Sequence, residues 1–297
     1  MAADRHYATP SAFRRALTDR LRALAEHSRW SLPQLQRQIA YDRLLARLYL
    51  TNDAWIVKGA TALLERDLAV RGTVDVDLYR SVPPDAAEVD LREAAQQDIG
   101  DWFRFEIGPG RPLSAGVAGI RLPVSAFIGT GEWCSFHVDL VGPDVRITGQ
   151  PDDVPPLARV SMPDIEQHGY RAYPLVDHVA DKVAAILQSY GPQRFPSTRY
   201  KDLIDLVAIV SRATIDAEAQ RAALDSEADR RDMRLPHAFS VPDRELWQKG
   251  YRAEARRSLL RTALTLDDAL DIVKPFIDPL LDGTAHGVWI PEEHQWR

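Results

Sequence analysis

The chain contains one cysteine among its 297 residues, Cys134, so no disulfide can form within it. A single thiol in an apolar run is typical of a packed side chain in a reducing compartment. Long hydrophobic runs are also missing, because no apolar stretch approaches the roughly 20 residues that span a bilayer. Arginines interrupt the first twenty residues four times, so we expect no signal peptide. These absences predict a cytoplasmic protein that binds no membrane.

Several kinds of chemistry have little support. The eight histidines show no metal-ligand spacing, and no serine or cysteine lies in the setting of a nucleophile elbow. The net charge of −6 argues against a general nucleic-acid binder, although the charge is unevenly distributed. Residues 1–50 carry nine arginines against four acidic residues, and residues 244–261 carry six more basic residues. Each basic segment either holds a phosphate backbone or is an ordinary solvated helix face.

Hydrophobic periodicity predicts three parts, bounded at residues 1–50, 51–155 and 156–297. In the first part, we expect helices over 10–29 and 32–50. In the second part, we expect a short strand at 55–57, helices over 60–68 and 85–99, and strands over 74–79, 102–107, 117–128 and 133–141. A proline-rich linker is expected at 151–156, followed by helices over 175–189, 199–212, 214–232, 243–263 and 266–281 and an irregular end. The expected fold class is α/β (α+β), a mixed sheet core with N-terminal helices and a C-terminal helical domain.

Two carboxylates mark the strand predicted over 74–79. Residues two apart on a strand point to the same face, so Asp75 and Asp77 lie side by side while Val74, Val76 and Leu78 face the core. Two like charges this close repel, and a divalent cation relieves the repulsion. Mg²⁺ prefers oxygen ligands and often uses one or two carboxylates together with substrate phosphates. An isolated pair is weak support for a metal site, since an exposed strand face has the same pattern.

Two nearby features strengthen the magnesium hypothesis. Lys58, Gly59, Ala60 and Thr61 form a turn between a short strand and a helix, where glycine and free helix N–H groups suit a phosphate. The alternative is an ordinary strand-to-helix turn. Asp139 lies on the polar face of the strand 133–141, where a third carboxylate suits a second metal ion or the proton of an attacking hydroxyl.

The helical half adds charged residues to an apolar background. Lys182 interrupts an otherwise apolar helix, and Arg199, Asp202 and Asp205 recur three residues apart on one face of the next helix. A lysine and an arginine that face a carboxylate site would suit a triphosphate. The alternative is a set of salt bridges between helices.

Together these motifs resemble the nucleotidyltransferase superfamily, in which a glycine and a small hydroxyl residue on a turn precede D-x-D and a later third acid. The closer resemblance is to the AbiEii/AbiGii toxin family, which includes mycobacterial toxins. It is carried by V-K-G-A-T-A-L at 57–63, R-G-T-V-D-V-D-L at 71–78, D-K-V-A-A-I-L at 181–187 and R-Y-K-D-L-I-D-L at 199–206. The family often has Gly-Gly or Gly-Ser where this chain has Gly59-Ala60, and the hydroxyl comes only at Thr61. Asp144 is an alternative to Asp139 as the third acid.

The resemblance implies a toxin that moves a nucleotide from an NTP to an RNA, with the 3′ end of tRNA as the expected acceptor and a block of translation as the result, and that has a cognate antitoxin as partner. Asp75, Asp77 and Asp139 are expected to bind two Mg²⁺ ions, and Asp202 to orient Lys182 or bind the nucleotide. The nucleotide itself is expected to contact Lys58, Gly59, Ala60, Thr61, Lys182 and Arg199.

Two further expectations concern control and the acceptor. Thr73 is a possible control point, because a phosphate added beside the carboxylates would oppose nucleotide binding. The arginine-rich N-terminal helices are a hypothetical RNA surface, which reversing the charges of Arg14, Arg15 and Arg22 would test.

Two other functions fit the same residues. A small-molecule nucleotidyltransferase of the antibiotic-modifying type would share the Asp75/Asp77 pair and differ only in its acceptor. A non-catalytic binding module with the same fold is the second alternative. The intact pair argues against that module, because a site without a cation has no physical reason to keep two repelling carboxylates.

Overall fold

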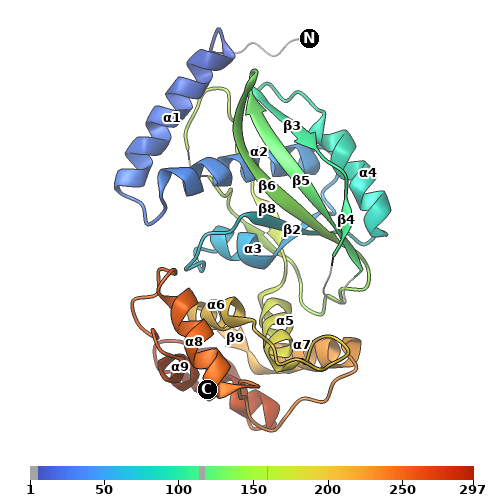
Figure 1. The fold of residues 1–297 in the computed structure, drawn as a ribbon, viewed down its shortest axis with the longest axis vertical. Helices are drawn as coiled ribbons and strands as arrows, with labels where there is room; N and C mark the ends of the chain where they lie inside the picture. Colours follow the sequence, from blue (N-terminus) through green and yellow to red (C-terminus); the bar gives the residue numbers. More distant parts are fainter. Residues whose placement is uncertain (1–5, 114–117, 159) are drawn as a thin grey trace. The chain divides into compact units, whose positions relative to one another are not determined.

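A computed structural model describes residues 6–113, 118–158 and 160–297, and its chain forms two compact units. The first unit consists of the described residues up to 66 together with 72–145 and 152–172. The second consists of 67–71, 146–151 and 173–297. Figure 1 shows a large sheet with helices in the first unit and mainly helices in the second.

The described residues of the first unit form four helices. They are α1 (Pro10–Glu26), α2 (Leu32–Thr51), α3 (Gly59–Glu65) and α4 (Pro84–Ala95). The start of α1 is set by Thr9, whose side chain accepts a hydrogen bond from the backbone N–H of Ala12, and by Pro10 in the first turn. At the start of α2, the Gln34 side chain accepts a hydrogen bond from the backbone N–H of Ser31 over 2.9 Å. These local signals explain why both N-terminal helices were predictable.

The sheet of the first unit is mixed. Its strands are β1 (Ile56–Lys58), β2 (Asp75–Tyr79), β3 (Phe103–Ile107), β4 (Arg111–Pro112), β5 (Gly119–Ile128), β6 (Gly131–Val141), β7 (Asp152–Val154) and β8 (Tyr170–Ala172). They run in the order β3-β5-β6-β2-β1-β8-β7, with β4 also paired to β5. The pairs β2–β6 and β1–β8 are parallel and the others are antiparallel. The predicted mixed-sheet α/β class is therefore confirmed.

One face of this sheet is the core of the first unit. Val76, Leu78, Val138 and Leu140 are buried and belong to one apolar cluster with residues of α1, α2 and α4. Val74 does not join them: its side chain is 52% exposed, because β2 begins only at Asp75. The prediction that Val74 faces the core is therefore wrong, while those for Val76 and Leu78 are confirmed.

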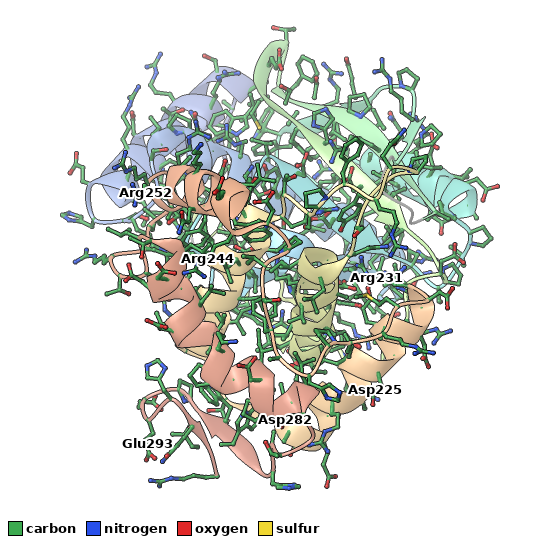
Figure 2. All side chains as sticks on the ribbon, turned by 60° about the horizontal axis from the view of Figure 1, so that its bottom comes forward. Asp225, Arg231, Arg244, Arg252, Asp282 and Glu293 are labelled. Atoms are coloured by element: carbon green, nitrogen blue, oxygen red, sulfur yellow. The ribbon has the colours of Figure 1, made fainter. Side chains whose placement is uncertain are left out.

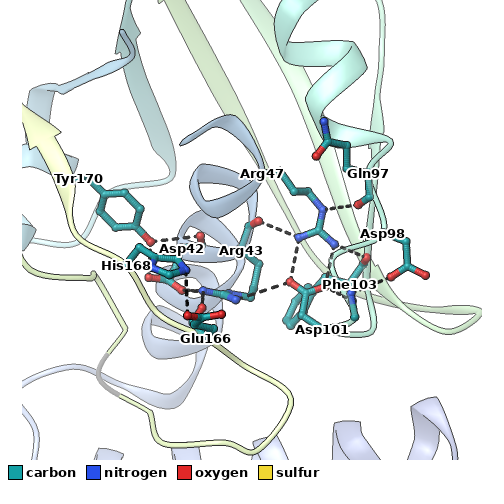
Figure 3. Close-up of polar contacts among 11 residues, drawn as sticks. Asp42, Arg43, Arg47, Gln97, Asp98, Asp101, Phe103, Glu166, His168 and Tyr170 are labelled. Atoms are coloured by element: carbon teal, nitrogen blue, oxygen red, sulfur yellow. Dashed lines mark hydrogen bonds and ion pairs between the residues drawn. The ribbon is translucent and has the colours of Figure 1, made fainter. Parts of the chain in front are cut away.

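A buried ionic network fastens α2 to the surrounding chain (Figure 3). Arg47 forms a two-pronged ion pair with Asp101, with nitrogen–oxygen distances of 2.8 and 2.7 Å. Arg43 donates to Asp42 over 3.0 Å, and Asp42 also accepts a hydrogen bond from Tyr170 of β8. Both arginines are buried and paired, so they supply no positive charge to a surface. Part of the +5 balance of residues 1–50 is therefore structural.

The second unit is built from five helices and a small sheet. The helices are α5 (Leu175–Leu187), α6 (Tyr200–Val210), α7 (Ala217–Arg230), α8 (Arg244–Ala255) and α9 (Leu266–Leu281). The strands are β9 (Ile215–Asp216), β10 (Val288–Ile290) and β11 (Gln295–Trp296), in the order β11-β10-β9. Trp289 of β10 is fully buried, and its indole N–H donates to the Val210 carbonyl at the end of α6. Burying this side chain orders the C-terminal segment, so the prediction of an irregular end is wrong.

Other differences from the predicted elements concern boundaries. The expected linker 151–156 instead contains β7, which pairs with β8, and its Asp152 forms an ion pair with Arg66. The expected helix 243–263 ends at Ala255, because residues 256–264 form turns. The strand expected from residue 117 begins at Gly119, and position 117 lies outside the described residues. No helix within the described part of the chain is both long and apolar enough to cross a bilayer.

Candidate functional site

A row of charged residues crosses the first unit's sheet on the face opposite the apolar core. Asp77 of β2 is in register with Lys58 of β1 on one side and with Asp139 of β6 on the other. Asp139 is in turn in register with Arg121 of β5. Residues in direct register present their side chains on the same face of a sheet. The strands therefore place two carboxylates between two basic residues.

The paired carboxylates sit at the centre of this row. Asp75 and Asp77 are both partly exposed on β2, and the residues between and after them are fully buried. Gly59 lies against Asp77: a Cβ atom at position 59 would stand 1.8 Å from the Asp77 Oδ2 atom. Gly59 also has a φ of +59°, a conformation that favours glycine. The turn before α3 thus needs glycine both for its backbone and to admit the carboxylate.

The two threonines near the pair hold β2 in place. Thr61 is fully buried, and its hydroxyl donates to the carbonyl of Asp75 over 3.2 Å. Thr73 is half-buried; its Oγ accepts from the N–H of Asp75 over 3.1 Å and lies 3.0 Å from the Asp75 carbonyl. Ala60 is buried at the start of α3. After Lys58, the turn therefore offers a ligand its backbone groups and no side chain.

Asp139 is engaged by an arginine that sequence reasoning missed. Arg121 Nε and Nη2 each lie 2.7 Å from a different Asp139 oxygen, and Nη2 is also 3.8 Å from Asp75 Oδ1. The hydrogen bonds and charge of Asp139 raise the pKa of Arg121, and Asp75 and Asp77 add to this effect. His137 of β6, in register with Asp75, approaches the same Asp75 Oδ1 atom with its Nδ1 at 3.4 Å. Arg121 lies within the strand predicted over 117–128, but the sequence pattern gave no signal of its partner.

The site's donor chemistry suits a magnesium ion carried by a nucleotide. Among the described residues, no group of three or more histidine, cysteine or acidic side chains is arranged to hold a metal ion by itself. Mg²⁺ is commonly held by one or two carboxylates plus substrate phosphates, and Asp75 and Asp77 supply such a pair. A cavity of about 300 Å³ lies elsewhere in this unit, against Pro10, Trp102 and Gly129, and includes no carboxylate of the row.

In the second unit, Lys182 is the centre of a buried ionic cluster. Its ammonium lies 2.9 Å from Asp202 and 2.7 Å from Asp205, and Asp205 also forms a two-pronged pair with Arg71 at 2.9 and 2.7 Å. Burial disfavours the charge of Lys182, but Asp202 and Asp205 outweigh it and raise the pKa of Lys182. Burial acts against the charge of Asp205 as well, yet Lys182 and Arg71 lower the pKa of Asp205. The cluster is balanced and links α5 to α6.

Arg199 and the arginines of the N-terminal helix complete the set of basic residues predicted from the sequence. Arg199 precedes α6 and stacks over the ring of Tyr190, with its guanidinium carbon 5.8 Å from the ring centroid. Arg14 donates to the carbonyls of residues 131 and 132, and Arg22 pairs with Asp19. These N-terminal arginines therefore have local structural partners.

The basic residues of 244–261 are exposed, and Figure 2 labels Arg244 and Arg252 on α8. Arg244 forms an ion pair with Asp267, and Arg257 lies 3.2 Å from Glu254.

Comparison with solved structures shows that the fold of this chain occurs in known proteins. The nucleotidyltransferase toxin MenT4 of Mycobacterium tuberculosis has a similar structure, with a TM-score of 0.51 and 18% identity over 91% of this chain and 98% of that one. JHP933 of Helicobacter pylori aligns with a TM-score of 0.44 and 13% identity over 83% of this chain and 92% of that one. No curated protein sequence matches. The likeness to MenT4 shows that the two chains share a fold.

The particular family follows from the sequence. The profile of the nucleotidyl transferase AbiEii toxin family, of type IV toxin–antitoxin systems, matches residues 43–272. The chain belongs to this AbiEii family of nucleotidyltransferase toxins, which confirms the resemblance drawn from its motifs.

Proposed function

We propose that the protein transfers a nucleotide from a Mg²⁺-bound NTP to the 3′ end of an RNA, with tRNA as the acceptor, and so blocks translation. The observation that carries the proposal is the Asp75/Asp77 pair, held side by side on β2 in a chain of this family. The type IV toxin–antitoxin assignment of the family supports a cognate antitoxin as partner. NTPs and tRNA occur together in the cytoplasm, where we place the reaction.

The residues of the row have distinct roles in this reaction. Asp75 and Asp77 would hold Mg²⁺, which neutralises charge on the triphosphate when bound. The acceptor hydroxyl loses its proton to water and forms a bond to the α-phosphorus, the bond between the α-phosphorus and the oxygen that bridges to the β-phosphorus breaks, and pyrophosphate leaves. Lys58, in register with Asp77, neutralises phosphate charge, and the backbone of Gly59 and Ala60 approaches the nucleotide. Positioning and charge neutralisation supply most of the rate in such transfers.

Within the second unit, Lys182 donates hydrogen bonds to Asp202 and Asp205, and we assign Asp202 the role of orienting the Lys182 ammonium. The Thr61 hydroxyl supports Asp75 by donating a hydrogen bond to the backbone carbonyl of Asp75. Arg199 is retained as a nucleotide contact.

Thr73 is proposed as a control point. Its hydroxyl bonds to the backbone of Asp75, and a phosphate on it would break this contact and add negative charge beside the carboxylates. Mass spectrometry of the toxin co-expressed with its antitoxin tests this, and an unmodified Thr73 would count against it.

The experiment that tests the main proposal uses total tRNA, Mg²⁺ and each α-labelled NTP in turn. Wild-type protein should label tRNA, and Asp75→Asn and Asp77→Asn variants should lose the label. Label on an aminoglycoside or another small molecule, with tRNA unlabelled, would support the antibiotic-type transferase instead. Absence of Mg²⁺-dependent NTP binding by the wild-type protein would leave the non-catalytic module.

A further inference from the structure

Arg121 engages both oxygens of Asp139, so a metal ion at Asp139 would have to share them with the guanidinium. Both carboxylate oxygens accept charge-assisted hydrogen bonds from Arg121, at 2.7 Å each, and the Asp139 side chain is only 10% exposed. A two-pronged pair of this kind is among the strongest and most directional contacts in proteins. Asp139 therefore fixes the plane and direction of the guanidinium.

Arg121 keeps donors that Asp139 does not use. Its Nε and Nη2 each donate one hydrogen bond to Asp139, which leaves the second N–H of Nη2 and both N–H groups of Nη1, and its side chain is 45% exposed. Nη2 stands 3.8 Å from Asp75, so the guanidinium lies beside the pair that would hold a metal-bound triphosphate. A planar, permanently charged fork is well matched to phosphate oxygens.

A second arginine lies next to the first. Arg111 of β4 is in direct register with Arg121 of β5, so both side chains are on the same face of the sheet, and Arg111 is exposed. Like charges directly opposite each other on paired strands destabilise the pairing. Asp139 compensates only one of the two arginines. An anion bound between them would compensate the other.

The geometry points to a phosphate subsite formed by Arg121 and Arg111, which receives the β- and γ-phosphates of the NTP, with Asp139 as the positioning residue of Arg121. This inference rests on the proposed nucleotidyl transfer and replaces the role expected of Asp139 as a metal ligand. The row then has a phosphate contact on each side of the central Asp75/Asp77 pair, with Lys58 on one side and Arg121 on the other.

The test measures equilibrium binding of each of the four NTPs with Mg²⁺ by calorimetry. Arg121→Gln should weaken binding about tenfold to a hundredfold, the loss of one charged hydrogen-bonding partner, and Arg121→Lys should recover only part of it. Asp139→Asn should weaken binding in the same direction. The Arg121→Gln/Asp139→Asn double variant should be no weaker than Arg121→Gln alone, because the two residues act through one contact. Arg111→Gln should weaken binding about threefold or more.

Controls separate the subsite from a metal-ligand role. Arg104→Gln alters an exposed arginine on β3 of the same sheet and should leave binding unchanged. Mn²⁺ titration of nucleotide-free protein, followed by electron paramagnetic resonance, should show about tenfold weaker binding for Asp75→Asn but an unchanged affinity for Asp139→Asn. The neutral double variant keeps the measurement possible if Arg121→Gln alone leaves Asp139 unpaired and unfolds the protein.

Three outcomes would overturn the inference. In the first, Asp139→Asn weakens Mn²⁺ binding as much as Asp75→Asn, which makes Asp139 a metal ligand. In the second, Arg121→Gln binds every NTP like the wild type. In the third, Arg121→Gln raises KM only for the RNA, which assigns the arginines to an acceptor phosphate. If the wild-type protein bound no NTP, the proposed function itself would fail, and the two failures are therefore distinguishable.

Discussion

Gly59 offers a sharp test of the carboxylate geometry, because a methyl group at this position would occupy the place of Asp77. The Cβ atom of Gly59→Ala would lie 1.8 Å from Asp77 Oδ2, whereas an ordinary contact begins at 3.4 Å. The carboxylate would have to retreat by about 1.6 Å or leave its rotamer. A misplacement of about 1 Å in a reacting constellation can lower a rate about a hundredfold. We therefore expect kcat for nucleotide transfer to fall at least about a hundredfold.

The same substitution carries a backbone cost that needs a matched control. The φ of +59° at Gly59 disfavours alanine by roughly 1–2 kcal/mol whatever its surroundings. Gly283 has a φ of +83° and nothing within 4 Å of the Cβ it would acquire. In urea denaturation, Gly283→Ala should therefore lower the free energy of unfolding by about as much as the backbone cost of Gly59→Ala, while kcat stays unchanged. If Gly59→Ala kept kcat within about threefold of the wild type, Asp77 would not be positioned as described.

Three further predictions concern buried groups. Glu65 is buried and its carboxylate has no hydrogen-bond partner among the described residues, so the pKa of Glu65 is raised well above 4.5. The folded protein therefore keeps the Glu65 proton to a higher pH than the unfolded chain does, and the free energy of unfolding should fall as the pH rises from 4.5 through the pKa of Glu65 in the folded protein. Glu65→Gln should remove that part of the slope in urea denaturation between pH 5 and 8; an unchanged slope would show that Glu65 stays charged. Lys182→Met should lower the free energy of unfolding by roughly 3 kcal/mol because Asp205 stays buried with less compensation, and a loss below about 1 kcal/mol would contradict the cluster's structural role. Burial raises the pKa of Cys134 to about 12, so its alkylation by iodoacetamide at pH 8 should be slow until urea unfolds the chain; fast alkylation of folded protein would refute this.

The sequence was informative wherever a local repeat decides the structure. The two-residue period of a strand places Asp75 and Asp77 together, and Val76 and Leu78 opposite them, without knowledge of the rest of the fold. Caps and proline set the starts of α1 and α2 in the same local way. The order along the chain of the turn at Gly59, the Asp75/Asp77 pair and the helix that contains Lys182 was enough to indicate the AbiEii family.

Only the tertiary structure decided which charged residues meet. Arg121 reaches Asp139 through the register of β5 on β6, and Arg71 reaches Asp205 across 134 residues of sequence. Strand register and helix packing depend on how whole apolar faces fit together, and a local pattern carries no information on which arginine falls opposite which carboxylate. For the same reason Arg47 read as surface charge in the sequence but is buried against Asp101 in the fold. Local periodicity determined the carboxylate pair, whereas long-range packing determined its neighbours.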